Sequence, residues 1–241
     1  IFADPDFAEM PSDELLSESF AKRLFERIKT DSVITPERLA VPLEGEGDTT
    51  YLTVVDGNGM MVSLIQSNYR GMGSGLVPTG LGFMLQDRGE LFSMELGHPN
   101  VYAPGKRPFH TIIPAFLMRD GEPYMSFGLM GGGMQPQGHV QVLVNMADFG
   151  MNVQEAGDAA RFRHDGGSSP DEGVSDRYGT LFVEPGVAQS TVEALRRMGH
   201  NVVVGGGAGK YGGYQAIIRD PDTGVLIGGT EMRKDGTAVG Y

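Results

Sequence analysis

The junction between residues 48 and 49 is the first place in this sequence where residue types suggest chemistry. Residues 30–48 carry prolines, glycines and acids without periodicity, so we expect an exposed, cleavable linker. Thr49 and Thr50 then open an apolar, β-branched run. A threonine hydroxyl needs a neighbouring base to act as a nucleophile, and a chain-terminal threonine supplies one in its own α-amine. Cleavage of the Asp48–Thr49 bond would create both groups, although threonine is also an ordinary residue at the start of a strand.

Glycine-rich segments at 71–75 and 128–133 are the second candidate for a site. Gly131 and Gly132 follow a predicted strand, where backbone N–H groups can point into a cleft and stabilise a tetrahedral oxyanion. The same run can equally be a turn that needs positive φ angles. Neither segment ends in the Lys-Ser or Lys-Thr of a phosphate-binding P-loop.

Composition narrows the remaining classes of function. The five histidines occur singly, without the spacing of zinc ligands, so we predict no metal and no organic cofactor. The formal charge of −12 repels phosphates, which argues against a nucleic acid partner. No window reaches the length of an apolar membrane span. The absence of cysteine leaves the compartment undecided between periplasmic or secreted and cytoplasmic.

The elements that must position these residues have an α+β pattern. An amphipathic helix is predicted over 12–29, with Ser12 as its N-cap. Turn residues predict three hairpins, centred on 56–59, 119–121 and 220–224, in antiparallel or mixed sheets. Further helices are predicted over 139–150, 153–162 and 187–199. The 241 residues fit one large domain or two small ones.

These signals follow one another in an order that resembles the γ-glutamyltranspeptidase family, including its glutaryl and cephalosporin acylase relatives. The matching stretches are DPDF, DTTYLTVVDGNGMMVSLIQSNYRGMGSG, PGKRPFHTIIPAFLMRDGEP, GLMGGGMQPQGHVQVLVNMADFGMNVQEAGDAARFRH and RKDGTAVGY, which together cover nearly the whole chain. The resemblance implies the four-layer αββα N-terminal-nucleophile hydrolase fold. It also implies self-cleavage before Thr49, with residues 1–48 as the C-terminal tail of a large subunit and 49–241 as the small catalytic subunit. The expected partner is therefore the large subunit of the same precursor, in a heterodimer or a dimer of heterodimers.

By the same resemblance, Thr49 attacks the acyl carbonyl of a small amide substrate and its α-amine acts as base. Ser67 takes the place of a hydroxyl residue that helps to activate the nucleophile, and Thr50 supports that geometry. Gly131 and Gly132 match the pair whose N–H groups form the oxyanion hole. The implied activity is acyl transfer, of a γ-glutamyl or glutaryl-type group, to water or an amine.

The expected acyl pocket departs from the family pattern. Tyr69 belongs to it, and His110 and Thr111 stand where the family has a Ser-Ser pair. Arg88 stands near the place where typical members hold the glutamyl ammonium. Arginine repels an ammonium and attracts a carboxylate, which favours a glutaryl-type acyl group. Asp87 is near enough in sequence to bind an amine, so γ-glutamyl stays open.

The chain has no room for a long lid between Phe92 and Pro99, so hydrolysis should compete well with transfer to an amine. An alternative function is that of an unprocessed, inactive relative with a structural or binding role, because an intact bond before Thr49 leaves no amine to act as base.

Overall fold

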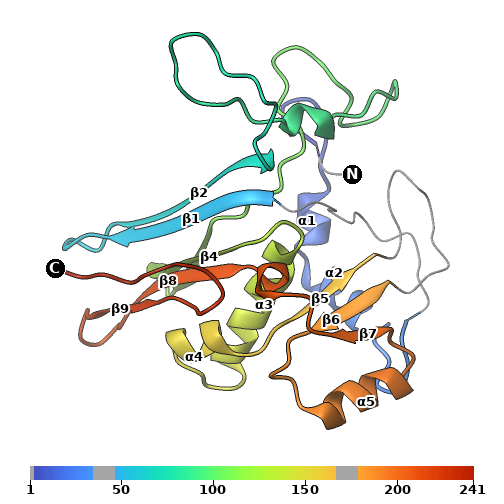
Figure 1. Ribbon diagram of the computed structural model, residues 1–241, viewed down its shortest axis with the longest axis vertical. Coiled ribbons are helices and arrows are strands. Elements are labelled where there is room, and N and C mark those ends of the chain that lie inside the picture. The colour runs from blue at the N-terminus through green and yellow to red at the C-terminus, as the bar shows by residue number, and fades with distance from the viewer. Residues whose placement is uncertain (1–2, 35–46, 167–178) are drawn as a thin grey trace. The chain divides into compact units, whose positions relative to one another are not determined.

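The computed structural model describes residues 3–34, 47–166 and 179–241 (Figure 1). The chain divides into two compact units. The first consists of residues 1–35 and 68–111, and the second of residues 36–67 and 112–241. Most of the predicted linker falls on residues 35–46 and lies outside the described residues.

The first unit contains two short helices where the sequence predicted one over 12–29. Helix α1 spans Ser12–Leu15 and α2 spans Glu18–Phe25. The break occurs because Ser17 has an extended backbone and its hydroxyl accepts the N–H of Phe20, so Ser17 caps a new helix. The predicted cap was therefore wrong: Ser12 lies inside α1 and makes no side-chain cap.

Asp4 anchors the start of the first unit to its last loop. The buried carboxylate accepts the backbone N–H of Arg107 at 2.8 Å and the Arg107 Nη2 at 2.6 Å. These hydrogen bonds hold the pKa of Asp4 well below its ordinary value. The same loop leads into residues 108–111. Besides α1, α2 and the end of β2, the described part of this unit contains one regular element, the short 3-10 helix η1 (Arg88–Leu91).

The second unit is built from the three predicted hairpins, all of which are confirmed. Strand β1 (Gly47–Val55) pairs with β2 (Met61–Arg70), whose last residues enter the first unit. Strands β3 (Ala115–Arg119), β4 (Glu122–Met130), β8 (Gly213–Arg219) and β9 (Leu226–Gly229) form an antiparallel sheet in the order β3-β4-β8-β9. The β3–β4 turn uses positive φ at Asp120 and Gly121, which their residue types tolerate.

A small third sheet makes the architecture mixed, as predicted. Strand β5 (Phe162–Asp165) runs antiparallel to β6 (Thr180–Val183), and β6 runs parallel to β7 (Val202–Val204). Helix α5 (Gln189–Arg197) connects β6 to β7, and the short helix η2 (Ala208–Tyr211) precedes β8. The end of α5 agrees with the prediction, because Gly199 just after it has positive φ.

The start of α3 and the end of α4 also differ from the sequence prediction. Helix α3 spans Met134–Ala147 and begins five residues before the predicted start at 139, because Pro136 fits the first turn of a helix. Helix α4 spans Val153–Asp158, capped by Asn152, and the predicted extension to 162 is wrong because Phe162 belongs to β5.

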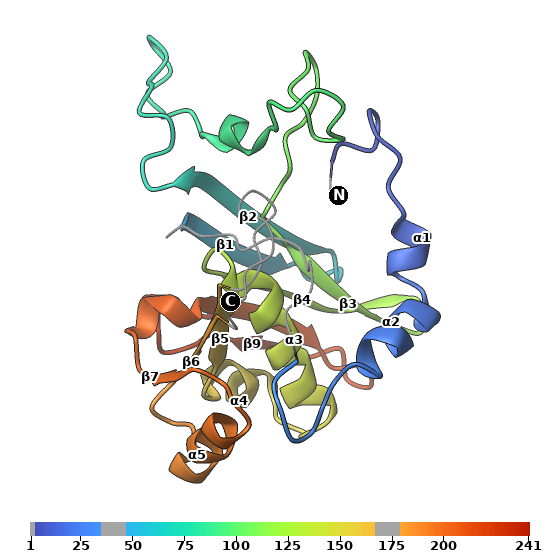
Figure 2. The ribbon, with the colours of Figure 1, turned by 90° about the vertical axis from the view of Figure 1, so that its right-hand side faces the viewer.

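The core of the second unit lies between the four-stranded sheet and helices α3 and α4 (Figures 1 and 2). It contains Met125, Phe127, Leu129, Met134, Val142, Val153, Ala156, Tyr214, Ala216 and Ile218. Helix α3 packs closely on β4, since a Cβ at Gly138 would lie 2.7 Å from Leu129 Cδ2. The β1–β2 hairpin packs on β4 through side chains described below. Within this unit two sheets therefore face each other, and helices cover the outer side of one.

Candidate active site

The β1–β2 hairpin brings the candidate nucleophile to a second hydroxyl group. Thr49 Oγ1 donates a hydrogen bond to Ser67 Oγ over 2.9 Å, although the two residues are 18 positions apart. Both side chains are half-buried. Thr50 points to the opposite side of the strand and is exposed, as the alternation along β1 requires. The side chain of Asp48 lies outside the described residues.

Buried hydroxyl groups fix the strand that carries Thr49. Tyr51 and Thr53 follow Thr49 on the same side of β1. Tyr51 OH lies 2.7 Å from Ser63 Oγ, and Thr53 Oγ1 donates to Ser126 Oγ on β4 over 2.6 Å. The Tyr51 ring lies over Gly128, where a Cβ would be 2.8 Å from Tyr51 Cζ. Burial raises the pKa of Tyr51, which keeps the phenol neutral.

Sequence reasoning missed these hydroxyls, although a signal for them exists. Thr49, Tyr51 and Thr53 alternate with Leu52 and Val54, whose side chains are exposed. The polar side of β1 therefore faces β4, and the apolar side faces away from it. The alternation of polar and apolar residues along β1 was visible in the sequence. The usual rule that apolar side chains face the interior would, however, have placed the wrong side of the strand against β4.

Gly131 and Gly132 form the bend between β4 and α3. Their φ angles are 131° and 57°, which only glycine adopts readily. Their carbonyl oxygens accept the N–H groups of Met134 and Gln135, both over 3.1 Å. Within the part of the chain that the structure describes, the N–H groups of the two glycines have no acceptor. This is the geometry of an available pair of backbone donors.

A buried arginine organises the candidate residues of the first unit. Arg88 is 2% exposed, its Nη1 donates to Thr111 Oγ1 over 2.5 Å, and its guanidinium lies 5.0 Å from the centre of the Tyr69 ring. Burial lowers the pKa of Arg88. In the described ranges no carboxylate forms an ion pair with Arg88. A buried cation without an ion-pair partner among the described residues is unusual, because such charges are normally paired.

The other two predicted pocket residues, Asp87 and His110, are more exposed than Arg88. Asp87 Oδ1 accepts the backbone N–H of Arg70 over 3.2 Å, so part of its hydrogen-bonding capacity is used within the loop. His110 lies at the surface, and partial desolvation together with the charge of Arg88 lowers its pKa. The candidates thus fall into two groups: Thr49, Thr50, Ser67, Gly131 and Gly132 in the second unit, and Tyr69, Asp87, Arg88, His110 and Thr111 in the first. Strand β2 links them, since Ser67 and Tyr69 are two residues apart.

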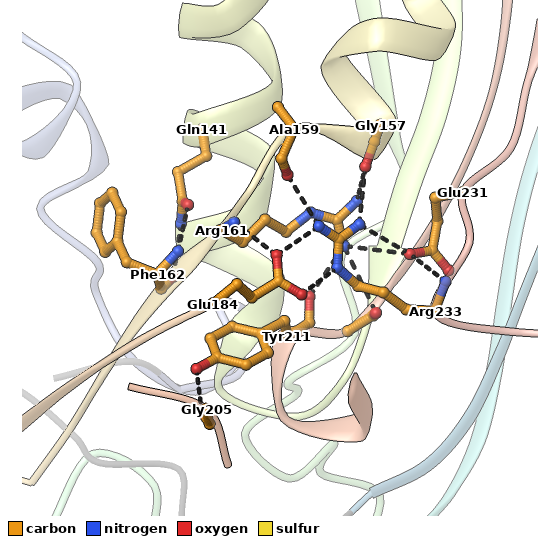
Figure 3. A network of polar contacts seen from close by, with 11 residues as sticks. Gln141, Gly157, Ala159, Arg161, Phe162, Glu184, Gly205, Tyr211, Glu231 and Arg233 are labelled. Atoms are coloured by element: carbon orange, nitrogen blue, oxygen red, sulfur yellow. Dashed lines mark hydrogen bonds and ion pairs between the residues drawn. The ribbon is translucent and has the colours of Figure 1, made fainter. Parts of the chain in front are cut away.

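A buried network of charges in the second unit was not predicted (Figure 3). Arg233 Nε and Nη2 bind Glu184 over 2.7 and 2.5 Å, and its Nη1 binds Glu231 over 3.1 Å. Arg161 Nη1 lies 3.8 Å from Glu231. The network joins three separate parts of the chain, and charged residues are usually expected at the surface, so the sequence gave no signal for it.

Among the described residues, no three histidine, aspartate or glutamate side chains lie close enough to hold a metal ion. None of the helices that the structure describes is long and apolar enough to cross a membrane.

A mixed α/β fold, with a threonine near the start of a strand and an available pair of backbone N–H groups on the same unit, has the character of the N-terminal-nucleophile hydrolases. Known proteins identify the family within that class. The family model for gamma-glutamyltranspeptidase matches residues 1–241, and the chain belongs to this family.

Individual relatives agree with the family assignment. The Glutathione hydrolase-like YwrD proenzyme of Bacillus subtilis is 36% identical over 243 residues, which cover 100% of this chain and 44% of that protein. The crystal structure of cephalosporin acylase from Bacillus halodurans is 41% identical with a TM-score of 0.83, over 99% of this chain and 41% of that one. A gamma-glutamyltranspeptidase from Pseudomonas nitroreducens is 25% identical with a TM-score of 0.66, over 80% of this chain and 99% of that one. The chain thus spans less than half the length of the first two.

Proposed function

We propose that this chain is the catalytic part of an autoprocessing amidohydrolase and acyltransferase. It transfers a γ-glutamyl or related, glutaryl-type acyl group from an amide to water or an amine through an ester on Thr49. The observation that carries the proposal is the hydrogen bond from Thr49 Oγ1 to Ser67 Oγ, because it holds a candidate nucleophile in one orientation near the start of a strand. The proenzyme name of the Bacillus subtilis relative supports processing.

The proposed cut lies between Asp48 and Thr49. Residues 1–48 would then be the tail of a large subunit, and 49–241, which is 241 − 48 = 193 residues, the small one. The Pseudomonas nitroreducens structure supports this boundary, because 99% of its chain is matched by 80% of this one, and 193 of 241 residues is also 80%. The two subunits would remain associated and complete the four-layer αββα fold.

In the proposed reaction, the α-amine of Thr49 removes the Oγ1 proton while Oγ1 attacks the amide carbonyl. Before cleavage Ser67 holds Oγ1 in place by accepting its hydrogen bond, and the freed α-amine then takes over as acceptor of that proton. Thr50 supports the strand end. The N–H groups of Gly131 and Gly132 stabilise the oxyanion. The departing amine takes the proton, which leaves an ester on Thr49. Water or an acceptor amine then attacks the ester by the same steps and releases the acyl group.

The proposed acyl pocket selects a carboxylate at the far end of the acyl group. A carboxylate would supply the ion pair that Arg88 lacks among the described residues, and Thr111 and Tyr69 hold the guanidinium in place. This supports a glutaryl-type group. Asp87 remains the feature that favours γ-glutamyl, since one carboxylate oxygen is not engaged by Arg70.

Hydrolysis of two p-nitroanilides by the processed enzyme tests this function. We expect glutaryl p-nitroanilide to react faster than γ-glutamyl p-nitroanilide, and Thr49→Ala to abolish both reactions. Arg88→Gln should remove the preference for glutaryl. Arg70→Gln is the matched control, because it deletes an arginine whose side chain is half exposed and pairs with Glu90. Strong preference for the γ-glutamyl anilide would refute the argument from Arg88, and turnover by Thr49→Ala would refute the role of Thr49.

A further inference from the structure

Arg161 belongs to the buried charge network and is 1% exposed (Figure 3). Its Nη1 donates to the carbonyl oxygen of Tyr211 over 2.9 Å and to that of Gly212 over 3.5 Å. Its Nη2 donates to the carbonyl of Gly157 over 2.8 Å. The planar guanidinium therefore connects the end of α4 to the segment between η2 and β8. Hydrogen bonds from a buried cation are stronger than neutral ones.

The segment that Arg161 holds lies directly against the glycine bend. A Cβ at Gly131 would be 2.7 Å from Gly212 Cα, so the two backbones are in contact. A Cβ at Gly212 would collide with the carbonyl oxygen of Met130. Met130 and Gly213 form the last pair of the β4–β8 ladder. The backbone after Met130 therefore cannot shift without moving the backbone around Gly212.

We propose that Arg161 is a positioning residue for the oxyanion hole, acting through the Tyr211 and Gly212 carbonyls on the N–H groups of Gly131 and Gly132. This inference rests on the proposed function. Donors aimed at a developing oxyanion act only when they are held in place before the reaction. Arg161 fixes a segment against which Gly131 is packed.

Arg233 provides a matched comparison within the same network. Its side chain is as deeply buried as that of Arg161 and binds Glu184, Glu231 and the carbonyls of Gly157 and Ala159. It donates to neither Tyr211 nor Gly212 in the described residues. A lysine at either position keeps the charge and loses the planar, multiple donors of the guanidinium.

The test compares the Arg161→Lys and Arg233→Lys enzymes, with the concentration of active sites titrated. The rate constants are measured with whichever anilide wild type hydrolyses better. The inhibition constant is measured with a boronic acid in which B(OH)2 replaces the acyl carbonyl, because its tetrahedral adduct with Thr49 imitates the oxyanion. For Arg161→Lys we expect kcat to fall by about 10- to 100-fold, with KM changed by less than about threefold. Boronate binding should weaken in parallel with kcat. Arg233→Lys should lower the unfolding temperature and leave kcat within about threefold of wild type.

The outcomes separate this inference from the proposed function. Equal kcat in wild type and Arg161→Lys, or equal losses in both variants, would overturn the positioning role. If Arg161→Lys does not fold, Arg161→Gln retains side-chain N–H donors and is tested in its place. Failure of both to fold would assign Arg161 to fold stability and also overturn the inference. A wild-type enzyme that hydrolyses neither anilide would instead refute the proposed function.

Discussion

Replacement of Gly128 by alanine tests how the nucleophile strand is held on β4. The φ angle of Gly128 is not positive, so alanine costs no backbone strain there, and the whole effect comes from the added methyl group. That methyl would lie 2.5 Å from Tyr51 Cδ2 and 2.8 Å from Tyr51 Cζ. Tyr51 is 4% exposed and its hydroxyl bonds to Ser63, so the ring has no free space to enter.

The expected cost in stability has two parts, because the added methyl group disturbs both the packing of the Tyr51 ring and the Tyr51–Ser63 hydrogen bond. Overpacking of a core costs about 1 to 3 kcal/mol, and displacement of the Tyr51 hydroxyl from Ser63 adds about 1 kcal/mol. We therefore expect a loss of about 2 to 4 kcal/mol in the free energy of unfolding, or on the order of 10 °C in Tm for a chain of this size. Displacement of Tyr51 should also move Thr49, two residues away on the same strand, and slow processing.

The assay is thermal unfolding of the uncut Thr49→Ala precursor with and without the second substitution. Gly57→Ala is the control, since Gly57 also lacks a positive φ and a Cβ there would meet nothing within 4 Å. Its Tm should stay within about 2 °C of the parent. A Gly128→Ala precursor as stable as the Gly57→Ala control would refute the account of how Tyr51 packs.

Two further substitutions test the site and its support. Ser67→Ala removes the acceptor of the Thr49 hydroxyl, so we expect slower processing by mass spectrometry and a kcat lowered by about tenfold or more with KM nearly unchanged; unchanged kcat would exclude Ser67 from the reaction. Burial lowers the pKa of His139 from 6.5 to about 4, and its Nε2 accepts the N–H of Leu129 over 3.0 Å. Below pH 6.5 the unfolded chain therefore binds a proton at this histidine, whereas the folded chain binds it only below about pH 4. The free energy of unfolding, measured in urea, should be about 2 kcal/mol lower at pH 5 than at pH 7. His139→Gln should remove that part of the pH dependence, and an equal slope in both proteins would contradict the assignment.

The local structure was predictable where a short motif fixes the backbone. Asp56 to Gly59 and Asp120-Gly121 define their turns by residue type, and the strands on either side follow from them. The break at Ser17 was not predictable from periodicity, because Leu16, Phe20 and Leu24 keep the helical spacing through it. A serine within a helical pattern can remain in the helix or cap a new one, and only tertiary context decides which.

Candidate site residues could be proposed from the sequence, but the residues that support them could not. Thr49, Ser67 and the glycine pair were candidates because their order along the chain resembles that of a known family. The residues that hold them, such as Ser126 and Arg161, carry no motif. Arg161 is 50 residues from the Tyr211 carbonyl that it binds, so only the folded chain reveals the contact. Buried arginines in particular are missed, because sequence reasoning assigns arginine to the surface.

The most direct test of the central proposal is the intact mass of the precursor during incubation, beside a Thr49→Ala variant of matched fold by circular dichroism. We expect wild type to split into two associated fragments, one beginning at Thr49, and Thr49→Ala to stay whole. Folded wild type that remains uncut, or that is cut at another bond, would contradict the account, because Thr49 would then have no α-amine to serve as its base.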